Sequence, residues 1–217
     1  MGPATQGRML ATATLPAMAQ LPLPPLPPLP PLPPAPPLPP GPPKPPVPAT
    51  AATIPAQPQW ASVYANTGRL CVQTCSGFDR CAHDPAGSTL FAALDAGPAP
   101  LGQAVLQALA ASRILQGAEA AHFFDPGVLA GRYQAWVAQL QAHFGAGSRS
   151  ALFDGLRHCV VTRAGGSIRL RPTRHDPRNA ENWTAEGMAP DLTVLIPGDA
   201  PPEAVGQALL LALDRCA

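Results

Sequence analysis

The distribution of proline is the sequence feature that most limits how this chain can fold. The chain has 217 residues and 32 prolines, and 22 of these prolines lie within residues 1–60. Proline lacks the backbone N–H that strand ladders and helix interiors need, so a folded core does not tolerate this density. We therefore predict a disordered, proline-rich segment over residues 1–58 and a single domain over residues 59–217, which is long enough for one hydrophobic core.

Within the proline-rich segment, residues 22–48 contain 18 prolines in 27 positions. This composition predicts an extended polyproline II rod, and a semi-rigid spacer is favoured over a ligand for an aromatic groove. Ala17-Met18-Ala19 matches a small-x-small cleavage site, which makes residues 1–19 a signal-like start. The apolar stretch before it is poor, so export, tethering and a true start further downstream all stay open. No run of apolar residues is long enough to predict a transmembrane helix.

Charge and missing motifs exclude several classes of function. The formal net charge is +1, which argues against direct nucleic-acid binding through a broad positive surface. Residues 61–217 contain no lysine, and this absence excludes Schiff-base chemistry, Ser–Lys dyads and a P-loop. The sequence has no G-x-S-x-G, H-E-x-x-H or glycine-rich dinucleotide motif, so no cofactor is predicted.

Hydrophobic periodicity predicts an α/β (α+β) fold, with a mixed β-sheet of about five or six strands and three main helices. The turn at residues 66–68 predicts a hairpin within residues 61–74, and Gly165-Gly166 predicts another within residues 158–171. The other expected elements are strands over 88–94 and 192–196, helices over about 95–115, 125–144 and 202–216, and a short helix over 150–156.

An internal repeat relates two of these elements at an offset of 104 residues. Residues 95–109 and 199–213 share an Asp-Ala pair, a Gly-Gln-Ala run and the following apolar positions, and both follow an apolar strand. The simplest interpretation is two strand–loop–helix units on one sheet.

Three cysteines and one histidine lie close together in the sequence, which raises the question of a metal site. Cys71, Cys75, Cys81 and His83 lie within thirteen residues, but their spacing lacks the C-x-x-C pairs of zinc knuckles. We predict no metal and reduced thiols, as is usual in a cytoplasmic protein.

Residues 172–190 are predicted to form a long polar loop. His175 and Asp176 could act as a base and its orienting group, but no nucleophile is placed near them by spacing. Mixed charge around one tryptophan is more typical of a protein-binding surface. The predicted partner-binding residues are Arg171, Arg174, His175, Asp176, Glu181, Trp183 and Glu186.

The folded part resembles the immunity proteins of bacterial contact-dependent growth inhibition (CDI) systems, from about Val63 to Cys216. The positions that carry the resemblance are the runs 106–113, 124–126, 133–136, 150–153, 168–175 and 194–197, with Cys159, Trp183 and the closing helix 209–215.

The resemblance implies a small cytoplasmic, non-enzymatic protein that binds and neutralises the C-terminal toxin domain of its cognate effector, often a nuclease. Because interface residues in this family vary with the toxin, the resemblance assigns no site residue. The alternative is an exported or surface-tethered α/β domain on a proline-rich stalk, with hydrolase activity as one option. The oligomeric state is not predicted.

Overall fold

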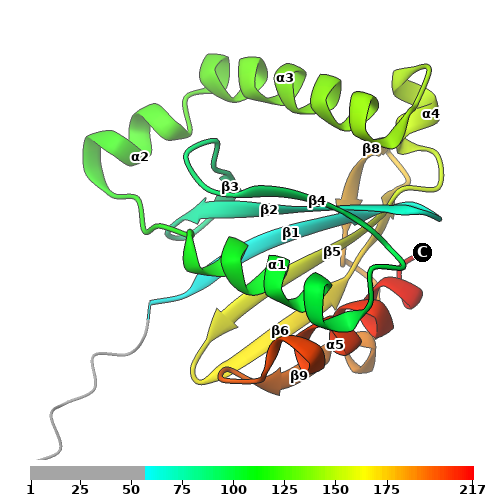
Figure 1. Ribbon diagram of the computed structural model, residues 1–217. Coiled ribbons are helices and arrows are strands. Elements are labelled where there is room, and N and C mark those ends of the chain that lie inside the picture. Colours follow the sequence, from blue (N-terminus) through cyan, green and yellow to red (C-terminus); the bar gives the residue numbers. More distant parts are fainter. Residues whose placement is uncertain (1–56) are drawn as a thin grey trace, which may run out of the picture. The chain divides into compact units, whose positions relative to one another are not determined.

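The computed structural model describes residues 57–217, so the disordered segment predicted over residues 1–58 lies almost wholly outside the described residues. The described part is an α+β unit in which helices lie on both faces of a central sheet (Figure 1). The predicted fold class is confirmed. The sheet has seven strands rather than five or six, and all pairs of named strands in the described part are antiparallel.

The sheet has the strand order β3-β2-β1-β5-β6-β9, and β4 also pairs with β2. Both predicted hairpins are confirmed, because β1 pairs with β2 and β5 pairs with β6. The strands are β1 (Gln59–Ala65), β2 (Arg69–Gly77), β3 (Cys81–His83), β4 (Thr89–Ala93), β5 (Arg157–Ala164), β6 (Ser167–Pro172) and β9 (Val194–Pro197). The helices are α1 (Pro98–Ala110), α2 (Gly117–Phe123), α3 (Pro126–Phe144), α4 (Arg149–Phe153) and α5 (Pro202–Asp214).

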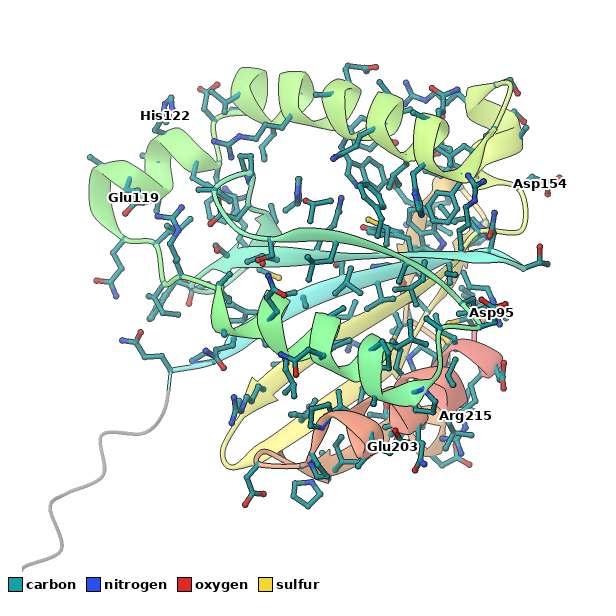
Figure 2. The ribbon with its side chains drawn as sticks, viewed as in Figure 1. Asp95, Glu119, His122, Asp154, Glu203 and Arg215 are labelled. Carbon is teal, nitrogen blue, oxygen red and sulfur yellow. The ribbon has the colours of Figure 1, made fainter. Side chains whose placement is uncertain are left out.

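One face of the sheet is closed by α1 and α5, which pack side by side on it (Figure 1). Alternate residues of β1, β2, β5 and β6 point toward these helices and are almost fully buried, as period-2 alternation requires. Acidic and other polar side chains such as Asp95, Asp154 and Glu203 lie on the outside of the molecule (Figure 2). The aliphatic side chains of this core include Val63, Leu70, Val72, Leu101, Val105, Leu109, Val161, Ile168, Leu170, Leu209 and Leu213.

The 104-residue repeat corresponds to β4–α1 and β9–α5, as the interpretation of two strand–helix units on one sheet required. The two helices touch at equivalent glycines. A Cβ at Gly102 would lie 1.8 Å from the Pro202 carbonyl oxygen, and a Cβ at Gly206 would lie 1.8 Å from the Pro98 carbonyl oxygen. Only glycine allows this close approach, so the repeat preserves a helix crossing.

The opposite face is covered in part by α3 and α4. The expected boundaries of α3 are confirmed: Asp125 accepts hydrogen bonds from the Gly127 and Val128 N–H groups, and Gly145 ends the helix with φ +71°. This layer buries a second, more aromatic cluster. Its buried members are Cys71, Trp136, Val137, Leu140, Leu152, Phe153 and Leu156.

The prediction of one long loop over residues 172–190 is wrong. The segment contains a hairpin of β7 (Arg174–Asp176) and β8 (Asn179–Thr184), followed by the 3-10 turn η1 (Pro190–Leu192). Short strands with one large apolar residue leave no clear period in the sequence. The hairpin is fixed from outside instead, because the Trp183 indole donates to the Leu156 carbonyl oxygen over 3.3 Å.

Candidate functional site

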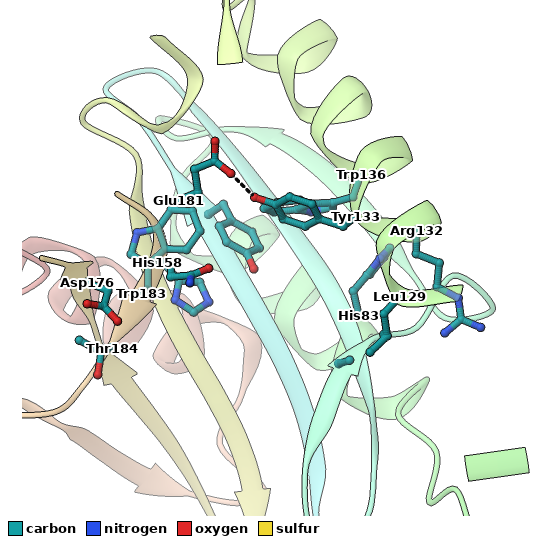
Figure 3. A pocket seen from close by; sticks show the side chains of 13 residues that line it. His83, Leu129, Arg132, Tyr133, Trp136, His158, Asp176, Glu181, Trp183 and Thr184 are labelled. Carbon is teal, nitrogen blue, oxygen red and sulfur yellow. Dashed lines mark hydrogen bonds between the residues drawn. The ribbon is translucent and has the colours of Figure 1, made fainter. Parts of the chain in front are cut away.

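A pocket of about 560 Å³ lies between α3 and the β7–β8 hairpin, over the aromatic face of β1 and β5 (Figure 3). It combines large rings with a few polar groups, which is the usual composition of a binding pocket. We call these lining residues the aromatic pocket: Tyr64, Ala82, His83, Leu129, Arg132, Tyr133, Trp136, His158, Asp176, Glu181, Asn182, Trp183 and Thr184.

Tyr64, on β1, is the centre of the aromatic pocket. Its ring stacks on His158 with centroids 4.6 Å apart, and it meets Trp136 and Trp183 edge-on at 5.2 and 5.4 Å. Tyr133 adds a further ring 5.3 Å from Trp136. These separations are those of mutually attractive aromatic pairs, so the floor of the pocket is a rigid assembly of ring faces and edges.

His158, on β5, carries the polar group of that floor. The side chain is 8% exposed, and its Nδ1 lies 3.0 Å from the Thr173 hydroxyl, which itself donates to the His158 carbonyl oxygen. Nδ1 therefore carries the proton, and Nε2 is an acceptor with no partner among the described residues. Burial, and then the charge of His175, lower the pKa of His158 to about 3, so the ring is neutral at physiological pH.

The indole N–H groups of both tryptophans are occupied inside the protein. Trp136 donates to Gln73 Oε1 over 2.8 Å, while Trp183 donates to the Leu156 carbonyl oxygen. Both indoles are thus held in position, and they present carbon atoms rather than donors to the pocket.

Two carboxylates stand at the rim near β7–β8. Glu181 forms an ion pair with Arg149 and accepts a hydrogen bond from the Tyr133 hydroxyl over 2.9 Å. These contacts, led by the Arg149 hydrogen bond, lower the pKa of Glu181. Asp176 accepts only the Arg178 backbone N–H, over 2.9 Å, and takes part in no ion pair within residues 57–217.

The structure brings three of the predicted partner-binding residues together at this pocket, namely Asp176, Glu181 and Trp183. His175 lies beside them, its ring 5.2 Å from Trp183. Trp183 is half-buried and packs into the domain, so the expectation that it stands on an exposed loop is wrong.

The other three predicted residues lie outside the pocket lining. Arg171 is exposed on β6, beside a second hollow of about 520 Å³ that it lines together with Arg169 and Leu195. The exposed Arg174 side chain donates to the Glu186 carbonyl oxygen over 3.0 Å, which ties the two ends of the hairpin together.

Sequence reasoning missed four ring-bearing residues of the pocket: Tyr64, Tyr133, Trp136 and His158. Tyr133 and Trp136 lie in the helix predicted over residues 125–144, and Tyr64 and His158 lie in the two predicted hairpins. A signal was present, since rings with polar atoms recurred on the face opposite the aliphatic core. The sequence alone did not show that these strands and the helix share one face.

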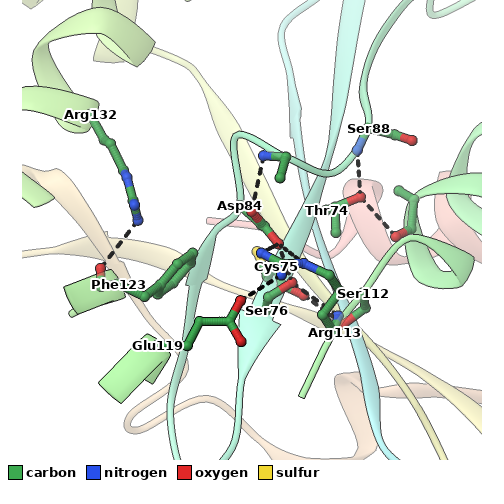
Figure 4. A network of polar contacts seen from close by, with 12 residues as sticks. Thr74, Cys75, Ser76, Asp84, Ser88, Ser112, Arg113, Glu119, Phe123 and Arg132 are labelled. Atoms are coloured by element: carbon green, nitrogen blue, oxygen red, sulfur yellow. Dashed lines mark hydrogen bonds and ion pairs between the residues drawn. The ribbon is translucent and has the colours of Figure 1, made fainter. Parts of the chain in front are cut away.

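A second polar cluster lies where the end of β2, the residue after β3 and the segment after α1 meet (Figure 4). Asp84 is 1% exposed and accepts hydrogen bonds from Ser76 over 2.7 Å and from Arg113 over 2.9 Å. Burial alone would raise the pKa of Asp84, but these bonds and one from Ala86 N–H outweigh it and lower that pKa. Arg113 also pairs with Glu119 over 2.7 Å. The charged groups of this cluster pair with one another, and the cluster connects β2 to the residues after α1.

All five cysteines are free thiols. In the part of the chain that the structure describes, no three His, Cys, Asp or Glu side chains are arranged to hold a metal ion. The Cys75 thiol donates to the Ser62 hydroxyl. Interaction with Cys81, followed by burial, raises the pKa of Cys75, and interaction with Cys75 lowers the pKa of Cys81. Cys159 lies in the aliphatic core, and burial raises its pKa.

Comparison with known proteins shows to which family this fold belongs. The profile of the CDI immunity protein family, CdiI, matches residues 59–216. This chain belongs to the CDI immunity protein family. The immunity protein CdiI-YPIII of Yersinia pseudotuberculosis serotype O:3 (strain YPIII) is 31% identical over 169 residues, covering 72% of this chain and 94% of that protein.

Two solved structures share the fold of this CDI immunity protein. A protein of unknown function from Neisseria meningitidis is 36% identical, with a TM-score of 0.68, and the likeness covers 74% of this chain and 96% of that one. A toxin and immunity complex, CdiA-CT/CdiI, from Yersinia pseudotuberculosis contains a chain 31% identical, with a TM-score of 0.67, covering 74% and 98% respectively. Over residues 57–217, no helix is both long enough and apolar enough to cross a membrane.

Proposed function

We propose that this protein binds the toxic C-terminal domain of its cognate CDI effector and blocks it stoichiometrically in the cytoplasm. Membership of the CDI immunity family over residues 59–216 carries the proposal. The relative from Yersinia pseudotuberculosis that was solved with its toxin supports the same partner class.

The aromatic pocket and the β7–β8 hairpin beside it form the toxin-binding surface. Aromatic rings form the floor of the pocket there. Beneath them, the Nε2 atom of His158 is a buried acceptor without a partner among the described residues. Buried polar atoms are normally satisfied, and a binding partner that supplies a donor removes the cost of leaving this one unpaired. Tryptophan and tyrosine are also the residues that most often concentrate binding energy.

The proposed mechanism is occlusion and involves no chemistry. The His158 imidazole, with a pKa of about 3, is a poor proton acceptor at neutral pH. The Thr173 hydroxyl beside it is buried and already donates to a carbonyl oxygen. These two observations favour an inhibitor over the alternative of a hydrolase.

We expect the toxin to be a nuclease, whose basic active site would face the acids Asp176 and Glu186. Arg174 and Arg178 lie in the same segment and Arg149 offsets Glu181, so the positions of these two acids, and not the net charge of the hairpin, support this expectation. We expect association to be fast and to slow with added salt.

Growth protection tests the proposal directly. Cells that express the toxin domain encoded beside this protein's gene should grow only when the protein is co-expressed, and the purified pair should bind with a Kd of about 1 nM or less. A Leu211→Ala variant, altered at a half-exposed position of α5 on the far side of the sheet, should protect as the wild type does. Absence of both protection and binding by the wild type would refute the proposal.

A further inference from the structure

We propose that the aromatic pocket is a cage for one arginine side chain of the toxin. This inference rests on the proposed function, because it names the chemical group that the toxin-binding surface recognises.

At the hairpin end of the pocket, Asn182 and Thr184 carry both donors and acceptors, whereas His158 Nε2 and the Asp176 carboxylate are acceptors alone. His158 Nε2 has a lone pair and no partner, and the Asp176 carboxylate has no ion pair among the described residues. The Glu181 carboxylate and the Tyr133 hydroxyl complete the rim, and the hydroxyl proton is already used between them. A site whose free positions are acceptors selects an occupant rich in N–H donors.

The flat surfaces of the pocket favour a cation among such occupants. Tyr64, Trp136 and Trp183 meet around the floor, and their N–H groups, where present, bond elsewhere in the protein. Ring faces attract a cation within about 6 Å of their centroids, and desolvation strengthens that attraction. The carboxylate of Asp176 adds a formal opposite charge at the rim.

Guanidinium fits better than ammonium. It is planar, stacks on aromatic rings, presents five N–H donors in a fixed fork and is more weakly hydrated than an ammonium group. It can therefore lie against the Trp183 ring while donating to Asp176. His158 Nε2 is closed to solvent in this structure, so a donor reaches it when the rings around it shift on binding. The volume of about 560 Å³ also leaves room for the backbone that carries this side chain.

The protein's own arginines do not fill this position. Arg132 lines the opposite end of the pocket (Figure 3), where its guanidinium lies over the Phe123 ring at 4.5 Å and donates to the Phe123 carbonyl oxygen (Figure 4). Arg149 stands behind Glu181, outside the lining residues, and is held there by its ion pair.

The first experiment uses a small probe on the whole protein. Nitrogen-15 NMR of the histidine rings is recorded with N-acetyl-L-arginine methylamide and with the neutral isostere N-acetyl-L-citrulline methylamide. We expect the arginine probe to shift His158 Nε2 toward the value of a hydrogen-bonded acceptor and to move the Trp183 indole signal, and the citrulline probe to do neither. Equal responses to both probes, or none to arginine, would overturn the cage.

The second experiment uses the toxin domain and matched variants. His158→Asn keeps a donor for Thr173 and removes the Nε2 acceptor, while Asp176→Asn keeps the acceptor for Arg178 N–H and removes the charge. Each should weaken toxin binding by about tenfold, and Glu203→Gln, which removes an exposed carboxylate of α5 on the other side of the sheet and keeps the acceptor for Gln207, should change it less than about twofold.

The outcomes separate the two proposals. If the wild type binds the toxin and both pocket variants bind equally well, the cage is wrong and the proposed function stands. If the wild type does not bind the toxin, the proposed function fails, while the response to the arginine probe still decides the chemistry of the pocket. Circular dichroism and urea unfolding of each variant show whether a loss of binding reflects a loss of fold.

Discussion

The two faces of the sheet are built on different principles. The face under α1 and α5 is aliphatic and closed, with glycines at the helix crossing and almost every side chain fully buried. The face under α3 and the β7–β8 hairpin is aromatic, holds its rings through hydrogen bonds and leaves a hollow. The closed face can be optimised for stability alone, whereas the aromatic face, as the proposed toxin-binding surface, would also have to keep a surface ready for a partner. Stability and recognition should therefore be separable by mutation.

The largest expected effect lies at the helix crossing of the closed face. Gly102→Ala places a methyl group against the Pro202 carbonyl, so α1 and α5 must move apart. We expect a loss of about 3 kcal/mol in the free energy of unfolding. Gly131→Ala is the control, because Gly131 lies in α3 with open space around it and should gain up to about 1 kcal/mol. Urea unfolding measures both, and equal effects would refute the crossing's role.

Trp183→Ala tests whether the aromatic face can lose binding without losing fold. The indole packs on Tyr64, Phe153 and His158 and anchors the hairpin, so we expect a loss of about 2 kcal/mol in stability together with a loss of toxin protection. Leu195→Ala, at a position 62% exposed on β9, should change neither. Loss of protection with unchanged stability would show that Trp183 is a contact residue alone.

The contrast between the faces also explains what the sequence could predict. The strands of the closed face show a regular alternation of apolar and polar residues. In β6, Ile168 and Leu170 are buried, whereas Arg169 and Arg171 are exposed. Asp125 and Gly145 marked the ends of α3 by local chemistry. Such signals depend only on neighbours in the chain, and sequence patterns therefore reveal them.

The pocket depends on contacts between distant segments, which patterns do not encode. Tyr64 and His158 are 94 positions apart and stack because β1 pairs with β5, whereas Trp183 reaches them through a hairpin of two short strands. The polar composition of residues 171–186 drew attention to Asp176, Glu181 and Trp183, and the structure places all three in the lining of one pocket. It could not show that Glu181 and Trp183 are already engaged with the domain.

A third, smaller effect should appear as pH dependence of stability on the aromatic face. The folded-state pKa of His158 is about 3, below the ordinary 6.5, so the unfolded state binds the extra proton as pH falls through this window. The contribution of His158 to the free energy of unfolding should therefore be fully present above about pH 6.5 and be lost as the pH falls toward 3. The loss should be at most about 2 kcal/mol down to about pH 5.

His158→Asn should flatten this decline, and His122→Asn, at an exposed site on α2, should not. Urea unfolding at several pH values provides the measurement. A decline of the same slope in the wild type and in His158→Asn would mean that another group dominates. His83 and His143, whose pKa values are also lowered by burial, would then be tested next.

The smallest effect on stability, with a clear effect on binding, is expected for the acids of the hairpin. Asp176→Lys and Glu186→Lys alter half-buried or exposed side chains with no ion pair among the described residues, so each should change the free energy of unfolding by less than about 0.5 kcal/mol. Glu181→Lys should lower the free energy of unfolding by more, since it leaves Arg149 and the Tyr133 hydroxyl without their partner.

If the toxin is a basic nuclease, Asp176→Lys and Glu186→Lys should slow association and reduce its salt dependence. Dissociation should change more for Asp176→Lys, because that carboxylate lines the pocket. Stopped-flow association at two salt concentrations tests this, and unchanged rates for both variants would place the toxin on another surface, the Arg169 and Arg171 face of β6 being the next to examine.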